Sequence, residues 1–405
     1  MALIVHKYGG TSVADAQRIK HVARKVARAR EQGHEVVVVV SAMGDSTDQL
    51  LELAHEVSAE PGERELDFLL STGEIVSSAL LSMALNAMNV PAVSLTGSQA
   101  GIWTDAQHGR SRILAVEAHR LKKELEAGKV VVVAGFQGIN RDMDITTLGR
   151  GGSDTSAVAL AAALGAERCE IYTDVEGVHT ADPRLVPGAR RLLEIGYEEM
   201  LELATWGAKV MHCRAVELGE FYKIPILVAS SFTDAPGTLI HGGVSMEVRN
   251  KVRGIAHDMD VAKVTVVGVP DHPGIAAALL EPLAKAGISV DTIVQNASLQ
   301  GITDFTFTVS RGDLKKALEI VQPLAKELKA REVVTDTSLA KVSVVGTGMQ
   351  NTPGYAARMF RTLAEEGINI QLISTSEIRI TCIIEEARVT DAVRALHRAF
   401  ELEKD

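Results

Sequence analysis

Short, uninterrupted apolar runs alternate with longer stretches of helical spacing over the first 240 residues. Runs such as 36–40 and 130–134 lack the polar–apolar alternation of a half-exposed strand, so their sheet must be covered on both faces. Because crossover helices provide such cover, the pattern predicts an α/β domain with a mostly parallel sheet. We expect strands at 3–5, 36–40, 92–95, 130–134, 171–172 and 226–229, and helices at 16–29, 73–87, 111–127, 155–164 and 197–218.

After residue 243 the chain repeats itself. The stretch AKVTVVG at 262–268 returns as AKVSVVG at 340–346, and a Pro-Gly pair follows each copy. A third block at 283–290 returns at 363–370. Three matches in the same order indicate a duplicated module, which reads strand, helix, strand, strand, helix, strand.

The second copy reaches the end of the sequence before its last strand. The spare segment 251–256 could supply that strand, which would interleave the two copies; a strictly tandem order is the alternative. The Gly- and Pro-containing stretch 233–243 indicates the main boundary. We therefore expect three domains, at 1–245, 246–336 and 337–405.

Composition narrows the possible functions. The 405 residues include 42 Lys and Arg against 52 Asp and Glu, a net charge of −10 that argues against nucleic-acid or anionic-membrane binding. The three cysteines are far apart and lack CxxC spacing, which argues against a zinc or disulfide framework. No leader-like start and no apolar run near the length of a membrane span are present. We expect a soluble, cytoplasmic protein.

Two glycine-rich loops are candidates for anion binding, although the chain has neither a Walker A motif nor a GxGxxG after a strand. In KYGGTS at 7–12, the glycines allow close backbone approach, and Lys7 adds a point charge for phosphate oxygens. In GRGGSDT at 149–155, Arg150 presents a fork suited to a carboxylate or phosphate ahead of a helix start. An ordinary turn and a capped structural loop are the respective alternatives.

A third loop, at 172–184, follows a strand and combines acidic, hydroxyl and arginine side chains. Nucleotides bind at such strand ends in open α/β sheets, and a plain turn is the alternative. The basic residues of the 16–29 helix are interpreted as a solvated face. Adjacent His212 and Cys213 do not have metal-ligand spacing, and we expect no protein-held metal.

Together with VSAMGD at 40–45, STGE at 71–74 and GAKV at 207–210, these loops resemble the motif series of the aspartate kinase family over the whole chain. The resemblance implies the amino-acid kinase fold, an αβα sandwich that binds ATP without a P-loop. It also implies two C-terminal ACT-type regulatory modules of βαββαβ topology, which would account for the duplication.

The reaction that the resemblance implies is phosphorylation of the L-aspartate β-carboxylate by ATP, with Mg²⁺ carried by the nucleotide. Lys7 and Asp154 would be catalytic, Arg150 would hold the substrate α-carboxylate, and Glu74 its ammonium group. The rest of the aspartate site would comprise Ser41, Thr47, Gly151, Gly152 and Ser153. ATP would contact Lys7, Tyr8, Gly9, Gly10, Thr173, Asp174, His179, Arg184, Lys209 and Val210. His179 stands where relatives commonly have tyrosine.

The resemblance also implies feedback inhibition by threonine, lysine or both. The effector pocket would comprise Asp271, Pro273, Gly274, Ser289, Val290, Asp291 and Gln295 of the first module and Tyr355, Ala356, Asn369, Ile370 and Ser376 of the second. Some relatives are α2β2 assemblies whose β chain starts inside the α reading frame. Met246 is placed for such a start, and a homodimer is the alternative. Two further functions stay open: a kinase for glutamate, acetylglutamate or carbamate, and a non-enzymatic amino-acid sensor.

Overall fold

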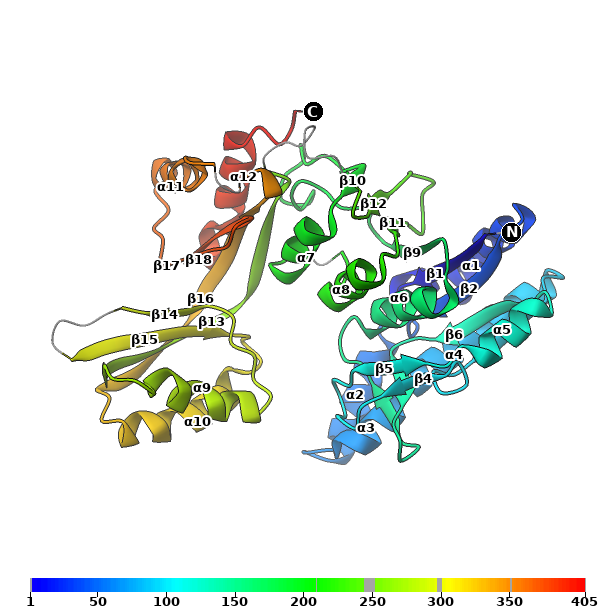
Figure 1. Ribbon diagram of the computed structural model, residues 1–405, viewed down its shortest axis with the longest axis horizontal. Coiled ribbons are helices and arrows are strands. Elements are labelled where there is room, and N and C mark those ends of the chain that lie inside the picture. The colour runs from blue at the N-terminus through cyan, green and yellow to red at the C-terminus, as the bar shows by residue number, and fades with distance from the viewer. Residues whose placement is uncertain (1, 209, 244–251, 297–300, 350–351, 405) are drawn as a thin grey trace. The chain divides into compact units, whose positions relative to one another are not determined.

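The computed structural model describes residues 2–208, 210–243, 252–296, 301–349 and 352–404 (Figure 1). Lys209 and Met246 lie outside these ranges. The chain forms two compact units, unit 1 from residues 1–179 and 190–248, and unit 2 from residues 180–189 and 249–405. The second and third expected domains lie together in unit 2, and ten residues from within the first expected domain, Thr180–Ala189, also belong to unit 2.

The main sheet of unit 1 has eight strands in the order β10-β12-β11-β9-β1-β2-β6-β3. All neighbouring pairs are parallel except β11 and β12. Its strands are β1 (Leu3–Tyr8), β2 (Glu35–Val40), β3 (Ala92–Leu95), β6 (Val130–Ala134), β9 (Arg168–Thr173), β10 (Glu194–Ile195), β11 (Ile226–Ser230) and β12 (Thr238–Ile240). The mostly parallel α/β sheet predicted from the apolar runs is confirmed.

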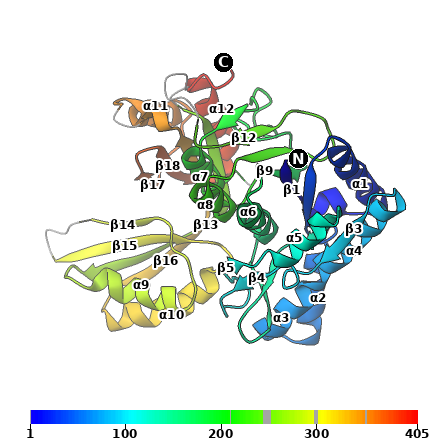
Figure 2. The ribbon, with the colours of Figure 1, turned by 45° about the vertical axis from the view of Figure 1, so that its right-hand side comes forward.

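Helices cover both faces of this sheet, as the fully buried valine runs require (Figure 2). Ile4, Tyr8 and Val38 pack with α1 (Ala16–Glu31) and α4 (Thr72–Ala87), whereas α6 (Gly152–Leu164) packs on the other face. Unit 1 also contains α2 (Ser46–Val57), α3 (Glu63–Leu70), α5 (His119–Glu126), α7 (Tyr197–Thr205), α8 (Cys213–Tyr222) and the 3₁₀ helix η1 (Gly10–Val13).

Two helix predictions were wrong in part. Residues expected to begin a helix at 111 instead form β5 (Ile113–Val116), whose partner is β4 (Ile102–Thr104) in a second sheet of order β5-β4-β7-β8. The other strands of that sheet are β7 (Gln137–Ile139) and β8 (Ile145–Thr147). The single helix expected at 197–218 is divided into α7 and α8, with Gly207 between them at φ +128°.

Unit 2 is built on two long antiparallel strands, β13 (Gly254–Pro270) and β16 (Glu332–Val345). The first part of β13 pairs with the last part of β16, and the last part of β13 pairs with the first part of β16. Each strand therefore serves both modules, which is the interleaved arrangement, with residues 254–258 beside the second repeat. The six-stranded order is β14-β15-β13-β16-β18-β17, with β14 (Ile293–Gln295), β15 (Ile302–Val309), β17 (Leu372–Thr375) and β18 (Arg379–Glu385).

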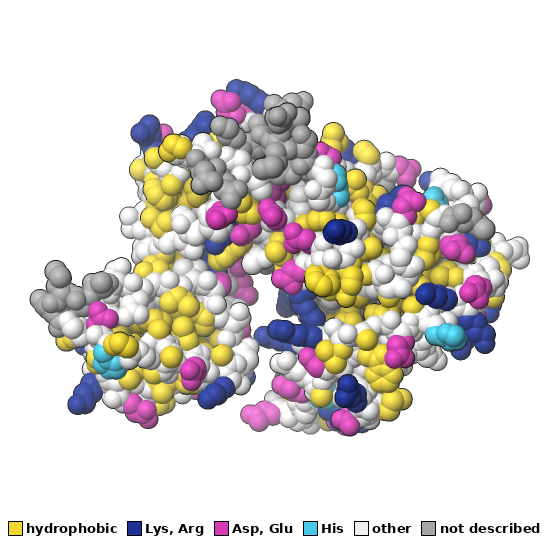
Figure 3. Space-filling model, in the orientation of Figure 1, with side chains coloured by type: hydrophobic (Ala, Val, Ile, Leu, Met, Phe, Trp, Pro, Cys, Tyr) yellow, Lys and Arg dark blue, Asp and Glu magenta, His cyan; other side chains and the backbone are white. Residues whose placement is uncertain are grey.

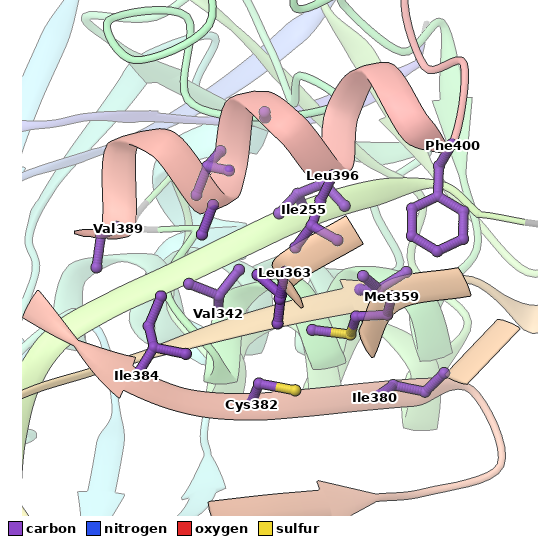
Figure 4. Close-up of a cluster of buried hydrophobic side chains, with 14 of the residues drawn as sticks. Ile255, Val342, Met359, Leu363, Ile380, Cys382, Ile384, Val389, Leu396 and Phe400 are labelled. Atoms are coloured by element: carbon purple, nitrogen blue, oxygen red, sulfur yellow. The ribbon is translucent and has the colours of Figure 1, made fainter. Parts of the chain in front are cut away.

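Each module has its own hydrophobic core. Phe305 and Phe307 lie in the first, with α9 (Ile275–Lys285) and α10 (Leu314–Glu327). In the second, α11 (Tyr355–Glu365) and α12 (Val389–Ala399) pack over β13, β16 and β18, with Leu396 directed at the sheet (Figure 4). Unit 2 also has the 3₁₀ helices η3 (Thr347–Met349) and η4 (Glu386–Arg388). The extra segment Thr180–Ala189 adds Ala181 and Val186 to this second core.

One helical stretch of the described residues, Glu63–Ala87, is long and apolar enough to cross a membrane by length and composition alone. It consists of α3 and α4, and 44% of its most apolar window is buried inside the protein. A core helix of a soluble protein passes the same test. Buried polar residues such as Asp67 and Glu74 interrupt its apolar runs, so the sequence of this stretch contains no continuous apolar run of membrane-spanning length. Charged side chains of both signs are interspersed over the face drawn in Figure 3.

Candidate active site

A pocket of about 320 Å³ in unit 1 is formed by side chains that are far apart in sequence. It lies where β1 and β2 end, next to the point where the sheet order reverses between β1 and β9. Open α/β sheets bind ligands at such a switch point. Every residue assigned to the aspartate site by resemblance lines this pocket. The lining consists of Lys7, Gly9, Gly10, Ser41, Ala42, Gly44, Thr47, Glu74, Phe136, Arg150, Gly151, Gly152 and Ser153.

Lys7, which lines the pocket, forms an ion pair with Asp154, which lies outside the lining. The Lys7 ammonium lies 2.6 Å from Asp154 Oδ1, and the two side chains are only 12% and 9% exposed. Lys7 points from β1 toward α6, and Asp154 is in the first turn of that helix. The other carboxylate oxygen accepts a hydrogen bond from the backbone N–H of His212, 3.2 Å away. Asp154 therefore fixes the position of the lysine ammonium at the pocket wall.

Two glycines allow the backbone to close around the pocket. A Cβ on Gly10 would lie 2.9 Å from the carbonyl oxygen of Ala42, which is closer than carbon and oxygen can pack. Gly151 has φ +70°, and a Cβ there would lie 2.4 Å from the ring of His212. Larger residues at either position would move the loop that carries Lys7 or Arg150, so the glycines are required by packing as well as by conformation.

Serine hydroxyls connect the β2 loop to α6 and α4. Ser41 Oγ donates to Ser153 Oγ at 3.0 Å, and Ser77 Oγ donates to the carbonyl of Ser41 at 2.7 Å. The carbonyl and hydroxyl of Ser41 are thus both held. This arrangement keeps the loop after β2 in register with the N-terminus of α6, which forms the opposite wall of the pocket.

Glu74 is a buried carboxylate in the pocket wall. It is 3% exposed, and Oε1 accepts a hydrogen bond from the N–H of Ala42 at 3.1 Å. Oε2 is buried and has no hydrogen-bond partner in the described structure. Burial raises the pKa of Glu74 to about 7, against the opposing effect of the Ala42 N–H. A carboxylate with an unused oxygen at a pocket wall is suited to receive an ammonium group.

We expect Glu74→Gln to stabilise the ligand-free protein at alkaline pH. The folded protein holds a proton on Glu74 up to about pH 7, whereas the unfolded chain releases it near 4.5. The wild-type protein therefore loses stability as pH rises from 4.5 to 7, by up to about 3 kcal/mol, and the glutamine variant does not. Chemical denaturation at pH 8 and at pH 5 measures the difference. Equal pH dependence in both proteins would contradict the burial argument.

Arg150 is exposed at the pocket mouth, and it makes no hydrogen bond or ion pair with any described residue. Two side chains that sequence reasoning did not identify form hydrogen bonds with its loop and with the neighbouring loop at 109–111. Arg214 donates to the carbonyls of Leu148 and Ser111, at 2.8 and 3.0 Å. Buried Asp67 accepts from the N–H of Gly109 and the hydroxyl of Thr147. Neither residue belongs to a recognisable motif, so only tertiary structure could identify them.

The expected nucleotide positions lie in several places. Thr173 ends β9 next to the Lys7 loop, since Gly9 N–H donates to Tyr172 O at 3.3 Å, and Thr173 Oγ1 donates to the carboxylate of Asp174. His179 pairs with Arg191 as an isolated bridge in unit 1, and Val210 is half-buried there. Arg184 belongs to unit 2, where it binds Asp182. Lys209 is outside the described residues.

The side chain of Tyr8 faces away from the pocket. Its side chain is fully buried and stacks on Tyr172, with ring centroids 4.8 Å apart, on the α1 side of the sheet. Successive strand residues face opposite sides, so Lys7 can reach the pocket only if Tyr8 points away from it. A nucleotide contact at Tyr8 would therefore involve its backbone.

The basic face of α1 is also less solvated than expected. Arg18 donates to the carbonyl of Thr11 in the Lys7 loop, and Lys25 donates to the carbonyls of Ser230 and Thr233. Lys25 also lies over the Tyr172 ring, 5.1 Å from its centroid. These cations attach α1 to the loops after β1 and β11. In the described part of the chain, no cluster of three or more His, Cys, Asp or Glu side chains is arranged to hold a metal ion.

In unit 2 several of the expected effector residues lie at equivalent positions of the two modules, near the start of the first helix of each module. Gly274 and Gly354 have φ values of +103° and +106° and precede α9 and α11. Gln295 on β14 donates to Asp271 at 3.4 Å, and Asp291 binds Lys341 and Thr308. Tyr355, Ala356 and Ile370 pack against the second core. Pro273, Ser289, Asn369 and Ser376 are exposed, and Val290 packs against the first core.

Comparisons with known proteins agree with both units. A model described as the amino acid kinase family matches residues 2–230, and ACT domain models match 263–326 and 342–400. Aspartokinase from Pseudomonas aeruginosa is 54% identical over 405 residues, which cover 100% of this chain and 98% of that protein. This chain belongs to the aspartate kinase family. The two repeats correspond to the two ACT domain matches.

Solved structures of aspartate kinases share the fold. E. coli aspartokinase III in complex with aspartate and ADP has a TM-score of 0.84 and 28% identity, with 98% of this chain and 99% of that chain covered. The same E. coli protein in complex with lysine and aspartate has a TM-score of 0.73 at the same identity and coverage. The resemblance and the fold class expected from the sequence are confirmed.

Proposed function

We propose that this protein is a feedback-regulated aspartate kinase, which transfers the γ-phosphoryl group of ATP to the β-carboxylate of L-aspartate. The products would be ADP and 4-phospho-L-aspartate, in the first step of lysine, threonine and methionine biosynthesis. The observation that supports this most directly is the pocket lined by Glu74, Arg150 and Lys7, with the Lys7 ammonium bound by Asp154. A carboxylate and a guanidinium suit the two ends of an unblocked amino acid, and the lysine suits a phosphate.

The chemistry needs alignment and charge neutralisation more than proton transfer. The β-carboxylate of aspartate is ionised at neutral pH and is itself the nucleophile, so no general base is required. Lys7 would neutralise charge on the transferring phosphoryl group, with the amide of Gly10 nearby, because the amide of Gly9 already donates to the Tyr172 carbonyl. Asp154 would hold the Lys7 ammonium in place. Mg²⁺ would arrive with ATP and supply further charge neutralisation.

An assay of ATP-dependent aspartyl hydroxamate formation tests the proposal. We expect product with aspartate and none above background with glutamate, acetylglutamate or carbamate. Phosphorylation of glutamate in preference to aspartate would favour another amino-acid kinase. Effector binding without phosphoryl transfer to any of these acceptors would favour a sensor.

For regulation we propose that threonine, lysine or both bind the ACT pair and inhibit the kinase. Asp271 is exposed in the loop before α9, and the N-terminus of that helix, where backbone N–H groups lack intrahelical partners, follows it. These groups match the ammonium and carboxylate of an amino acid. We also propose a cytoplasmic enzyme that assembles as a homodimer or as α2β2 with a β chain from near Met246.

Asp271→Asn should raise the effector concentration for half-maximal inhibition about tenfold, because it removes the charge expected to bind the effector ammonium. The uninhibited kcat should not change, since Asp271 belongs to unit 2. Glu281→Gln is the matched control, as Glu281 is exposed on α9 of the same module. Titration with threonine and with lysine measures both variants. An Asp271→Asn variant with wild-type sensitivity to both would remove Asp271 from the effector pocket.

A further inference from the structure

The loop expected to bind nucleotide continues directly into the core of a regulatory module. Residues 173–179 belong to unit 1, whereas Thr180–Ala189 belong to unit 2, and Arg190 returns to unit 1. We call Thr180–Ala189 the excursion. It begins immediately after His179 and contains Arg184. Both residues are nucleotide positions by family resemblance. This feature was not predicted, since the ten residues carry no signal for a separate domain.

Within unit 2 the excursion is held by hydrogen bonds as well as by apolar packing. Thr180 and His397 are each 1% exposed, and Thr180 Oγ1 is hydrogen-bonded to His397 Nε2 at 2.9 Å. The carbonyl of Thr180 accepts from the N–H of Ile255 at 2.8 Å. Farther along, Arg394 Nε donates to the carbonyl of Leu185 at 2.7 Å. His397 and Arg394 are both on α12, so this one helix holds the excursion at Thr180 and at Leu185.

Apolar contacts fix the same segment. Ala181 and Val186 are 4% and 7% exposed in the core that contains Ile255, Leu396 and Phe400. Leu185 and Ala189 pack against that core. The excursion is therefore a structural part of the second ACT module, and it cannot leave without exposing that core.

The residues that flank the excursion, 178–179 before it and 190–192 after it, form hydrogen bonds within unit 1. These two flanking segments are called its stems. Leu192 N–H donates to the carbonyl of Val178 at 2.8 Å, and His179 bridges to Arg191. Fully buried Thr238 joins the stems, because its Oγ1 accepts from the N–H of Val178 and donates to the carbonyl of Leu192 at 2.6 Å. Since one peptide unit spans only 3.8 Å, a displacement of Thr180 must be taken up at His179.

We propose that the excursion transmits the state of the second ACT module to the nucleotide loop, and that Thr180, His397 and Arg394 are positioning residues for ATP. This inference rests on the proposed function, because the resemblance assigns His179 and Arg184 to the nucleotide. Anchoring by α12 pre-orders the loop, so that ATP does not have to order it on binding. A rearrangement of the module by an effector alters that order and lowers nucleotide affinity.

The test compares full-length variants that differ in one contact. Thr180→Val removes the hydroxyl with little change in volume, and Thr180→Ser retains it. Arg394→Ala removes the second anchor, and Arg398→Ala is its matched control, one turn along on α12 with a side chain 62% exposed. Each protein is measured for KM of ATP, KM of aspartate, inhibition by threonine and lysine, thermal unfolding, and ATP binding without aspartate by calorimetry.

We expect Thr180→Val and Arg394→Ala each to raise KM and Kd for ATP about three- to tenfold, the range for one lost hydrogen bond, with KM for aspartate within about twofold. Their inhibition should require more effector. Thr180→Ser and Arg398→Ala should behave as wild type. Unchanged ATP affinity in Thr180→Val and Arg394→Ala, or an equal rise of both KM values with a lower Tm, would overturn the inference. A wild-type chain that binds ATP but phosphorylates no aspartate would overturn the proposed function alone, and one that binds no ATP would overturn both.

Discussion

Lys7→Met should lower kcat for aspartate phosphorylation by about a thousandfold, which is the largest effect we expect from any single substitution. The Lys7 ammonium is almost enclosed and is held at 2.6 Å by Asp154, so its charge is oriented before substrates bind. A preorganised charge in a site with little water stabilises the transferring phosphoryl group more than a solvated one does. Aspartate affinity should change little, because Glu74 and Arg150 are assigned to that substrate. Steady-state kinetics with each substrate varied give kcat and both KM values.

Folding must be separated from chemistry, because Lys7→Met leaves the nearly buried Asp154 carboxylate without its cation. Loss of one partner of a buried pair destabilises a protein more than loss of both. The double variant Lys7→Met, Asp154→Asn should therefore regain much of the lost thermal stability while kcat stays low. Lys20→Met, at an exposed position of α1, is the control for loss of a lysine. A Lys7→Met variant within a few-fold of wild-type kcat would remove Lys7 from the mechanism.

The sequence was sufficient to predict features that local pattern determines. Continuous valine runs predicted the buried parallel strands β2 and β6, because only a sheet covered on both faces accommodates them. The repeated AKV blocks predicted the duplicated modules. The glycine-rich loops predicted most of the pocket, since Gly10 and Gly151 are required where backbone and His212 approach closely.

Features that depend on tertiary contacts could not be predicted from pattern. The sequence of β5 is typical of the start of a helix, but pairing with β4 makes it a strand. Asp67 and Arg214 hold loops that are remote from them in sequence. The loop expected at 172–184 gave no sign of a packed segment, although Ala181 and Val186 complete a core built around α12. The spacing of two alanines, one leucine and one valine over ten residues has no period that would distinguish such a segment from an ordinary loop.

Arg150→Ala should raise KM for aspartate about 100-fold, equivalent to about 3 kcal/mol, with little change in KM for ATP. Arg150 lines the pocket and has no ion pair among the described residues, so its guanidinium is available for the substrate α-carboxylate. Its loop is held through Leu148 by Arg214, which fixes the backbone next to Arg150 before substrate binds. Arg150→Lys keeps the charge but loses the two-pronged geometry, so it should recover only part of the loss, to about tenfold.

Arg141→Ala is the matched control, because Arg141 is exposed in unit 1 outside the pocket lining, and its KM values should equal those of wild type. Initial rates with aspartate and ATP varied in turn give the comparison. A larger rise in KM for ATP than for aspartate would move Arg150 to the nucleotide. Equal rises in both would indicate that the loop as a whole had shifted, since the Gly149–Gly152 turn also shapes the wall that faces Lys7. Only a selective rise for aspartate supports Arg150 as the ligand for its α-carboxylate.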